Sequence, residues 1–148
     1  MQKTFSKTEI PKIAKAILAS LKPKTKHQTA GGATVITLSG ELGAGKTTLT
    51  QTIARDLGVK ENVISPTFVI MKSYKIVDSR FKTLVHIDAY RLDSAKELER
   101  LGWAALIADP ENLILIEWPE RVPEAIPATA HKVFLSHKNE DEREIRFV

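Results

Sequence analysis

Residues 34–48 read TVITLSGELGAGKTT, and this stretch decides the fold. Residues 34–38 are mostly β-branched and predict a short strand, while residues 46–57 predict a helix that Gly58 ends. Between them, residues 40–47 fit the pattern G-x-x-x-x-G-K-[ST], the phosphate-binding loop, in the strand–loop–helix context that this motif requires. The alternative is an ordinary glycine-rich turn. The match of pattern and context favours a nucleotide-binding α/β domain.

The residue types of this loop suit a nucleotide triphosphate. Glycines allow backbone conformations in which successive N–H groups point toward one anion at the start of a helix. Lys46 is expected to reach the β- and γ-phosphates, and the hydroxyl of Thr47 to bind Mg²⁺, which prefers hard oxygen ligands. The expected nucleotide-binding residues are Gly40, Glu41, Leu42, Gly43, Ala44, Gly45, Lys46, Thr47 and Thr48.

Two apolar stretches end in an acid. Residues 84–87 lead to Asp88, and residues 113–116 lead to Glu117. A phosphate-binding loop needs an acid near its metal, commonly at the end of a neighbouring strand, and either residue qualifies. The longer glutamate can contact Mg²⁺ directly or through water, while Asp88 can orient the attacking water or hold other ligands in place. The alternatives are a helix cap for Asp88 and a solvated strand end for Glu117.

Three further positions are open to two interpretations. Thr67, in Ser65-Pro66-Thr67, stands where many nucleotide hydrolases have a switch segment, although a plain proline turn before a strand explains it equally well. Trp118 is a core anchor or a partner contact, with the core favoured. His86 is expected to pack or to hydrogen-bond within its strand, because a lone histidine makes no metal site.

The rest of the chain completes an α/β pattern. A helix is expected from Ser6 or Thr8 to Leu21, followed by a loop containing Pro23. Strands at 67–77 and 81–88 are expected to form a hairpin around Asp78, and a helix opened by a Ser94–Glu97 capping box to bend near Gly102. A strand buried on both faces at 113–116 and a last hairpin at 132–137 and 142–148 complete the pattern. The sequence predicts one P-loop NTPase-like domain, residues 1–148, with a mixed, mostly parallel sheet flanked by helices and antiparallel hairpins. Residues 1–32 form a helix and linker, and residues 33–148 form the sheet core.

Composition excludes several classes of protein. The 148 residues include 43% hydrophobic and 27% charged residues, which is typical of a globular domain. There is no cysteine, so the chain has no disulfide and no thiolate metal site. No apolar run approaches the roughly 18 residues of a membrane span, so we expect a soluble, cytoplasmic protein without a membrane partner.

The net charge of +4 is unevenly distributed. Residues 1–27 hold seven lysines and one glutamate, a net charge of +6. Such a segment can attract a phosphate backbone, but a solvated helix face is the favoured interpretation. The chain lacks the Asn-Lys-x-Asp sequence of guanine-binding proteins, so ATP is the expected nucleotide.

Several motifs together resemble one family. They are the loop at 40–48, Ser65-Pro66-Thr67-Phe68, His86-Ile87-Asp88-Ala89-Tyr90-Arg91-Leu92, Glu97-Leu98-Glu99 with Gly102, and Leu115-Ile116-Glu117-Trp118-Pro119. Their order and spacing over about residues 34–127 are similar to those of TsaE, the bacterial ATPase family of tRNA threonylcarbamoyladenosine biosynthesis. Departures are Phe68, where many relatives have tyrosine, and Glu41, where many have aspartate.

The resemblance implies a function. Members support a partner pair, of the TsaB and TsaD type, that modifies the adenosine beside the anticodon in tRNAs reading codons that begin with A. It implies ATP and Mg²⁺ as cofactors and indirect contact with tRNA. The sequence places no arginine over the γ-phosphate, which predicts weak hydrolysis unless a bound partner organises the switch segments. A small-molecule kinase, with Asp88 as the base, is the alternative, and a nucleotide-gated binding module whose basic N-terminus holds nucleic acid is a third.

The resemblance also implies roles for single residues. It assigns Thr47 and Glu117 to the metal, and Lys46, Asp88, Glu117 and Thr67 to catalysis or switching. Trp118 becomes a candidate at the nucleotide or partner surface. Adenine is expected near the N-terminal segment, at Phe5 or Ser6. Arg91 is the arginine nearest the site by motif, with a structural salt bridge as the alternative.

Overall fold

The computed structural model describes residues 1–21, 31–66, 68–77 and 79–148. One sheet of seven strands, in the order β1-β7-β6-β2-β5-β4-β3, runs through it. The strands are β1 (Gln2–Ser6), β2 (Thr34–Ser39), β3 (Met71–Lys75), β4 (Thr83–Asp88), β5 (Asn112–Glu117), β6 (His131–His137) and β7 (Glu142–Phe147). The central strands β6, β2, β5 and β4 are parallel, while β7, β1 and β3 are antiparallel to their neighbours. The predicted fold class, a mixed sheet with antiparallel hairpins, is confirmed.

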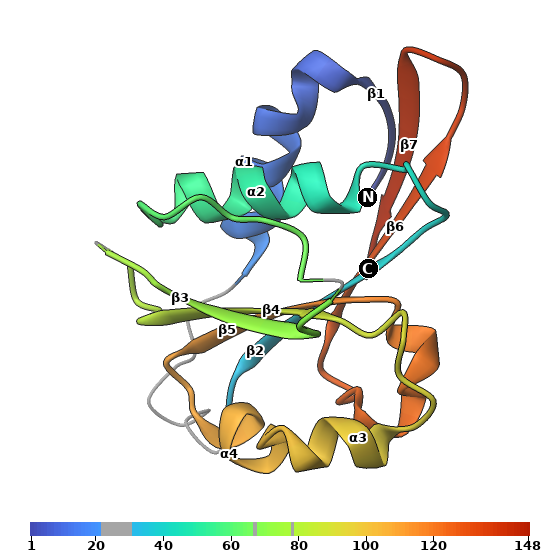
Figure 1. The fold of residues 1–148 in the computed structure, drawn as a ribbon. Helices are drawn as coiled ribbons and strands as arrows, with labels where there is room; N and C mark the ends of the chain where they lie inside the picture. Colours follow the sequence, from blue (N-terminus) through green and yellow to red (C-terminus); the bar gives the residue numbers. More distant parts are fainter. Residues whose placement is uncertain (22–30, 67, 78) are drawn as a thin grey trace.

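Helices cover both faces of the sheet (Figure 1). The helices α1 (Ile10–Ser20) and α2 (Lys46–Asp56) lie over one face, and α3 (Ala95–Arg100) and α4 (Trp103–Ala108) over the other. Single 3₁₀ turns lie between β1 and α1, at η1 (Lys7–Glu9), and between β5 and β6, at η3 (Pro119–Arg121) and η4 (Pro123–Ala125). Two apolar clusters result, one on each face of the sheet. No helix of the described residues is long and apolar enough to cross a membrane.

The central strands are buried because both of their faces are covered. All six residues of β5 are buried, as the uninterrupted apolar run at 113–116 predicts. Alternate side chains point to opposite faces, so Leu113 and Leu115 join the cluster under α1 and α2, while Ile114 and Ile116 join the cluster under α3 and α4. The strand therefore ends with Glu117 on the same face as α2.

The secondary structure of the N-terminal residues differs from the prediction. Sequence patterns predict a helix and linker over 1–32, but residues 2–6 form β1 and pair with β7 at the edge of the sheet. The N–H of Ser6 donates to the carboxylate of Glu9 at 2.8 Å, and this hydrogen bond lowers the pKa of Glu9. The helix predicted from Ser6 or Thr8 begins as the 3₁₀ turn η1 and continues as α1.

Two local predictions were wrong in detail. Residues 68–70 are a turn rather than part of the predicted strand, which begins at Met71, and Ile70 has a left-handed backbone with φ 69°. The carboxylate of Glu97 accepts the N–H of Asp93 at 2.7 Å, so the expected capping box with Ser94 does not form. The predicted bend at Gly102, with φ 90°, separates α3 from α4. Predictions for Pro23, Thr67 and Asp78 lie outside the described residues.

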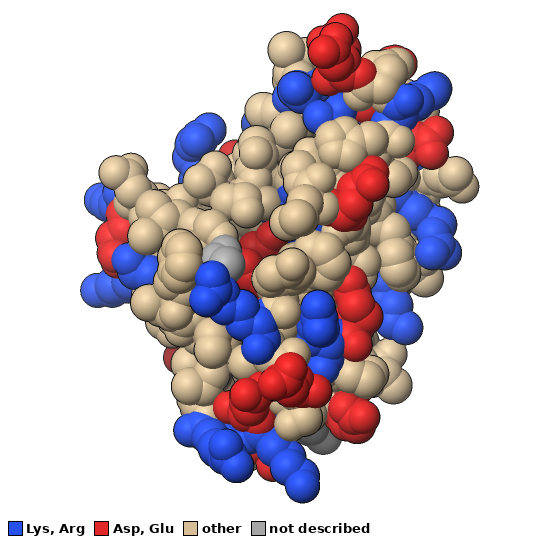
Figure 2. Space-filling model, turned by 45° about the vertical axis from the view of Figure 1, so that its right-hand side comes forward, with Lys and Arg blue, Asp and Glu red and all other residues tan. Residues whose placement is uncertain are grey.

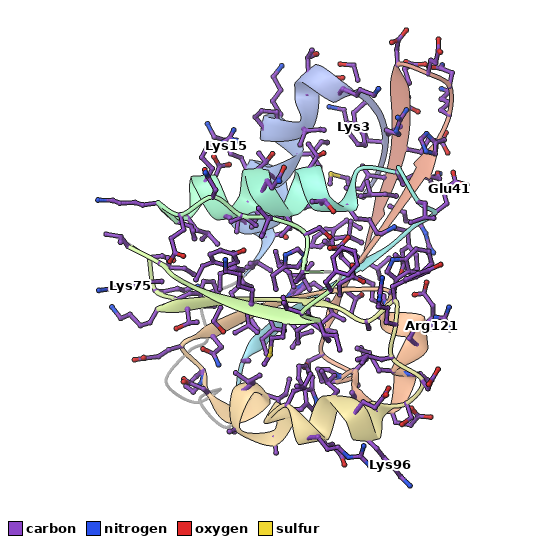
Figure 3. The ribbon with its side chains drawn as sticks, in the orientation of Figure 1. Lys3, Lys15, Glu41, Lys75, Lys96 and Arg121 are labelled. Atoms are coloured by element: carbon purple, nitrogen blue, oxygen red, sulfur yellow. The ribbon has the colours of Figure 1, made fainter. Side chains whose placement is uncertain are left out.

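Charged side chains surround this core. Lys and Arg are interspersed with Asp and Glu over the face in Figure 2. Lys3, Lys7, Lys12 and Lys15 are exposed, and Lys3 lies 3.7 Å from Glu9. In Figure 3 Lys15, Lys75 and Lys96 extend away from the body of the molecule. The described part of the basic N-terminal segment is thus a solvated face, as the favoured interpretation holds.

A pH dependence of stability is expected from His131, at the start of β6. Burial lowers the pKa of this histidine below its usual 6.5, and the charge of Arg80 lowers it further. The unfolded chain therefore binds this proton more readily, so the free energy of unfolding should fall as the pH drops below about 6.5. Urea unfolding at pH 7.5 and 5.5 measures this fall, and His131→Asn should reduce it.

The matched control is His137→Asn, at the exposed end of the same strand. This variant should keep the pH dependence of the wild type. An unchanged dependence in His131→Asn would contradict the assignment to His131.

Candidate functional site

The phosphate-type loop lies at the carboxyl ends of the parallel strands, beside a cavity. The loop joins β2 to α2, and β5 and β4 end next to it. The cavity has a volume of about 240 Å³, and its walls are Leu42, Gly43, Gly45, Lys46, Thr47, Thr48, Ser65, Asp88, Glu117 and Trp118. The structure therefore brings together the predicted loop and both predicted acids, although they are far apart in the sequence.

Two glycines of the loop are required by geometry. Gly45, the N-cap of α2, has φ 104°, a conformation that side chains rarely adopt. Gly40 has no room for a side chain, because a Cβ there would lie 2.4 Å from the carbonyl oxygen of Leu135. Gly45 turns the chain into the helix, and Gly40 lets β6 pack against the loop.

Lys46 is a buried cation held by the loop itself. Its side chain is 5% exposed, and Nζ donates to the carbonyl oxygens of Gly40 at 2.5 Å and Glu41 at 3.0 Å. Burial lowers the pKa of Lys46, while the charges of Glu117 and Asp88 oppose this shift. A desolvated ammonium group interacts with an anion more strongly than one in water does. The lysine is therefore placed to exchange carbonyl partners for phosphate oxygens.

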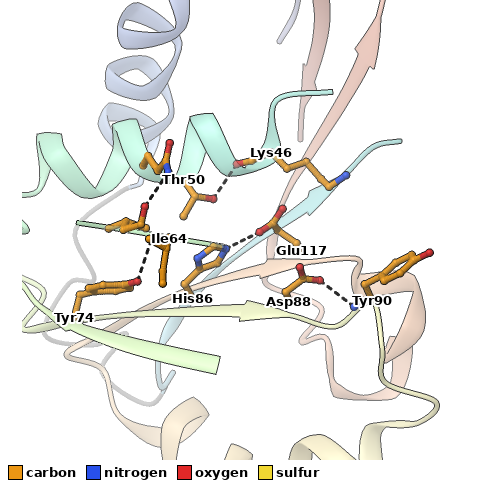
Figure 4. A network of polar contacts seen from close by, with 10 residues as sticks. Lys46, Thr50, Ile64, Tyr74, His86, Asp88, Tyr90 and Glu117 are labelled. Atoms are coloured by element: carbon orange, nitrogen blue, oxygen red, sulfur yellow. Dashed lines mark hydrogen bonds and ion pairs between the residues drawn. The ribbon is translucent and has the colours of Figure 1, made fainter. Parts of the chain in front are cut away.

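The two acids are neighbours across the sheet. Asp88 and Glu117 occupy paired positions at the ends of β4 and β5, and both are buried. An Oδ of Asp88 accepts the N–H of Tyr90 at 3.0 Å, which fixes a turn rather than a helix N-terminus (Figure 4). Glu117 is 3% exposed, so the alternative of a solvated strand end is wrong. Burying two carboxylates beside Lys46 costs free energy that a bound cation would offset.

Glu117 has a buried partner that the sequence did not assign to it. Nε2 of His86 lies 2.6 Å from Oε2 of Glu117, and both side chains are buried. His86 does hydrogen-bond, as expected, but its partner is an acid of the site on β5. The alternation of side chains along β4 is the sequence signal for this contact, because it places Leu84, His86 and Asp88 on one face of the strand.

Trp118 combines the two interpretations of the sequence. It is half-buried, has a left-handed backbone with φ 58° and lines the cavity. Its ring centroid lies 4.4 Å from Nζ of Lys46 and 5.1 Å from the ring of Tyr90. The indole thus packs on the charged group of the site, a cation–π contact. The contact with Tyr90 was not foreseen.

A second cavity adjoins the first along the loop. Its volume is about 360 Å³, and it is lined by Phe5, Lys7, Ile10, Gly43, Ala44, Gly45, Thr48, Leu49, Leu135 and Arg143. Three loop residues, Gly43, Gly45 and Thr48, border both cavities. The second cavity is the more apolar, as a flat heterocycle requires. Phe5 is in its wall, whereas Ser6 is not among the lining residues.

The donor set fits Mg²⁺ rather than a softer metal. The oxygen groups of the residues that line the cavity are the carboxylates of Asp88 and Glu117 and the hydroxyls of Thr47, Thr48 and Ser65. Within the described residues, no group of three or more His, Cys, Asp and Glu could hold a metal by itself. A Mg²⁺ ion held by one or two protein oxygens, with water and phosphates as its other ligands, matches such a site.

One expected residue, Arg91, is not part of this geometry. Arg91, the arginine suggested by motif, is exposed and lies over the ring of Phe68, 4.7 Å from its centroid. Thr67 lies outside the described residues, although Ser65 of the same motif lines the cavity. Among the described residues, no arginine lines the cavity at the two acids.

Comparison with known proteins points to one family. The family described as "Threonylcarbamoyl adenosine biosynthesis protein TsaE" matches residues 4–145. The tRNA threonylcarbamoyladenosine biosynthesis protein TsaE of Bacillus subtilis is 35% identical over 145 residues, which are 98% of this chain and 82% of the relative. The protein of the same name from Nostoc sp. is 36% identical over 120 residues, 79% of this chain and 71% of the relative.

A solved structure agrees with these sequence matches. The crystal structure of Bacillus subtilis YdiB superposes with a TM-score of 0.68 at 30% identity, covering 99% of this chain and 84% of that chain. The similarity therefore extends over nearly the whole chain in both sequence and fold.

Proposed function

This chain belongs to the TsaE family of tRNA threonylcarbamoyladenosine biosynthesis proteins, and on that premise we propose that it is a cytoplasmic Mg-ATP-dependent ATPase. It acts as the accessory subunit of a threonylcarbamoyl transferase complex. Its partners are subunits of the TsaB and TsaD type, through which it meets tRNA indirectly.

The observation that carries the proposal is the convergence of four groups on one cavity. Lys46 and Thr47 come from the loop, and Asp88 and Glu117 come from the ends of two neighbouring strands. In phosphoryl transfer to water the protein mainly positions the reactants and stabilises charge, and these groups suit both tasks. Lys46 binds phosphate oxygens, Thr47 and Glu117 hold Mg²⁺, and Asp88 orients the attacking water. A bound Mg²⁺ supplies neutralisation of the phosphate charge.

The second cavity supports a complete nucleotide site. A triphosphate lying along the loop would leave its base beside Gly43 and Thr48, where the two cavities meet. Phe5 and Ile10 offer apolar surface to an adenine there. The residues of β1 and α1 thus belong to the nucleotide site as well as to the fold.

Weak hydrolysis by the isolated chain is expected because few positive side chains line the cavity in which the phosphates would bind. Lys46 is the one basic side chain among the described residues that line the cavity beside Asp88 and Glu117, called the phosphate cavity from here on. Comparable enzymes gain a factor of about 10³–10⁵ in kcat from an arginine that stabilises the transition state. A partner that supplies or organises such a charge would therefore raise turnover.

Exposed apolar side chains near this cavity support docking of a partner there. Leu42 is 72% exposed and lines the cavity, and Ile64 and Phe68 flank the Ser65-Pro66 segment with exposures of 57% and 84%. Exposed apolar side chains at and near a cavity are surface that a partner protein can cover. A partner bound at this place would reach the γ-phosphate.

The proposal is tested by ATP hydrolysis with the purified chain, alone and with a TsaB–TsaD partner pair. We expect slow turnover alone and a rise of at least about tenfold with the partners, with Lys46→Ala as the blank in both conditions. ATP binding with flat turnover in the presence of partners would contradict partner activation. Small-molecule acceptors would then be tested, since ADP formation that depends on an acceptor defines a kinase.

A further inference from the structure

His86 is a buried histidine to which the proposed chemistry gives no task. It lies on β4 two residues before Asp88, and its side chain is completely buried. Figure 4 shows its imidazole ring directed at Glu117, with Nε2 2.6 Å from Oε2. The contact joins two neighbouring parallel strands at the edge of the phosphate cavity.

The neighbours of His86 on β4 and β5 are apolar, while the half-buried Lys72 pairs with it on β3. Leu84 precedes it on the same face of β4, and Leu113 and Leu115 lie on that face of β5, all in one apolar cluster. A buried imidazole costs free energy unless its polar atoms are hydrogen-bonded, so a leucine would pack here at lower cost. The carboxylate of Glu117 is the partner that compensates for the polar ring.

The hydrogen bonds assign the ring proton to Nε2. Nδ1 is buried and has no hydrogen-bond partner among the residues that the structure describes. A protonated Nδ1 would be a buried donor without an acceptor, and orphaned N–H groups are rarer than bare acceptors. Nε2–H therefore donates to Oε2 of Glu117. The other carboxylate oxygen, Oε1, is left for a ligand in the cavity.

We propose that His86 is a positioning residue that fixes the rotation of the Glu117 carboxylate, so that Oε1 binds the Mg²⁺ of the nucleotide complex. This inference rests on the proposed function, Mg-ATP binding. Acidic ligands of metals are commonly held by such a hydrogen bond, and removing it typically lowers metal affinity about 10- to 100-fold. Because both residues are buried in central strands, the carboxylate is oriented before the metal arrives.

Two amide variants test this role. In His86→Gln the amide nitrogen lies about as far along the side chain as Nε2 and can still donate to Glu117, whereas the shorter amide of His86→Asn cannot reach it. Calorimetry gives the Kd of ATP in excess MgCl₂ and in EDTA, and the ratio of the two constants measures the metal contribution. We expect His86→Asn to lose about 10- to 100-fold of this ratio and His86→Gln to keep most of it.

The control is Val85→Ala, which creates a small cavity in the apolar cluster on the opposite face of the same strand. It destabilises β4 without touching Glu117 and should leave the ratio unchanged. Equal ratios in His86→Asn and the wild type, or equal losses in both amide variants, would overturn the positioning role. Wild-type ATP binding that is insensitive to Mg²⁺ would overturn it too, while wild-type protein that binds no ATP would refute the proposed function itself.

Discussion

Lys46→Ala is expected to lower the affinity for Mg-ATP about 10- to 100-fold, because it removes a charge-assisted contact worth about 1.5–3 kcal/mol. ATP hydrolysis should fall by a further factor of about 10²–10³, the typical loss when one donor to a developing negative charge is removed. Nζ of Lys46 is buried beside the cavity and is held by two carbonyl oxygens of the loop. The ammonium group is therefore in place before the nucleotide binds.

The measurements are ATP titration calorimetry and steady-state hydrolysis, with thermal unfolding to establish that the variant folds. The matched control is Lys72→Ala on β3, whose Nζ also lies over an aromatic ring, 5.4 Å from the centroid of Tyr74, but which is not among the residues that line the cavity. This control should bind and hydrolyse ATP as the wild type does. A folded Lys46→Ala protein with wild-type affinity would refute phosphate binding by the loop.

Glu117→Gln and Asp88→Asn are expected to separate metal binding from catalysis. Glu117→Gln should lose the Mg²⁺-dependent part of ATP affinity, by at least the factor of about 10 that applies to residues supporting a metal ligand. Asp88→Asn should keep Mg-ATP affinity within about threefold and lose a factor of about 10²–10⁴ in kcat, as for removal of a group that handles a proton. The reason is that Glu117 is held rigidly by His86, whereas Asp88 contacts the turn at Tyr90.

Each of these variants is assayed for ATP affinity with and without Mg²⁺ and for kcat with the partner pair. The two substitutions change one oxygen to nitrogen in paired positions of β4 and β5, so each serves as the control for the other. The reverse pattern, with metal dependence lost in Asp88→Asn alone, would exchange the proposed roles. Identical losses in both variants would mean that the two carboxylates share the metal.

Local patterns predicted the fold class and the loop because both depend on short stretches of chain. The strand at 34–38, the glycine turn and the helix from Lys46 are adjacent in sequence, and the loop's residue types suit an anion at the start of a helix. The strand that is buried on both faces could be predicted for a similar reason, since the residues of β5 are apolar on both faces. The acids Asp88 and Glu117 were found because parallel strands place their carboxyl ends at one edge.

Contacts between distant segments were decided by the tertiary structure alone. Strand β1 exists through pairing with β7, a partner about 140 residues away, and its five residues carry no strand pattern strong enough to predict it. The second cavity forms where β1, α1 and β6 meet the loop.

The same distinction holds within the site. The sequence was enough to predict a site with a lysine, a threonine and two carboxylates, because the chemistry of these residue types suits a nucleotide. That His86 holds Glu117, and that Trp118 covers Lys46, was decided by the register of β4 with β5 and by the left-handed turn at Trp118. The physical reason is that a hydrogen bond or ring contact needs atoms within a few ångströms, and only packing of the whole chain sets such distances.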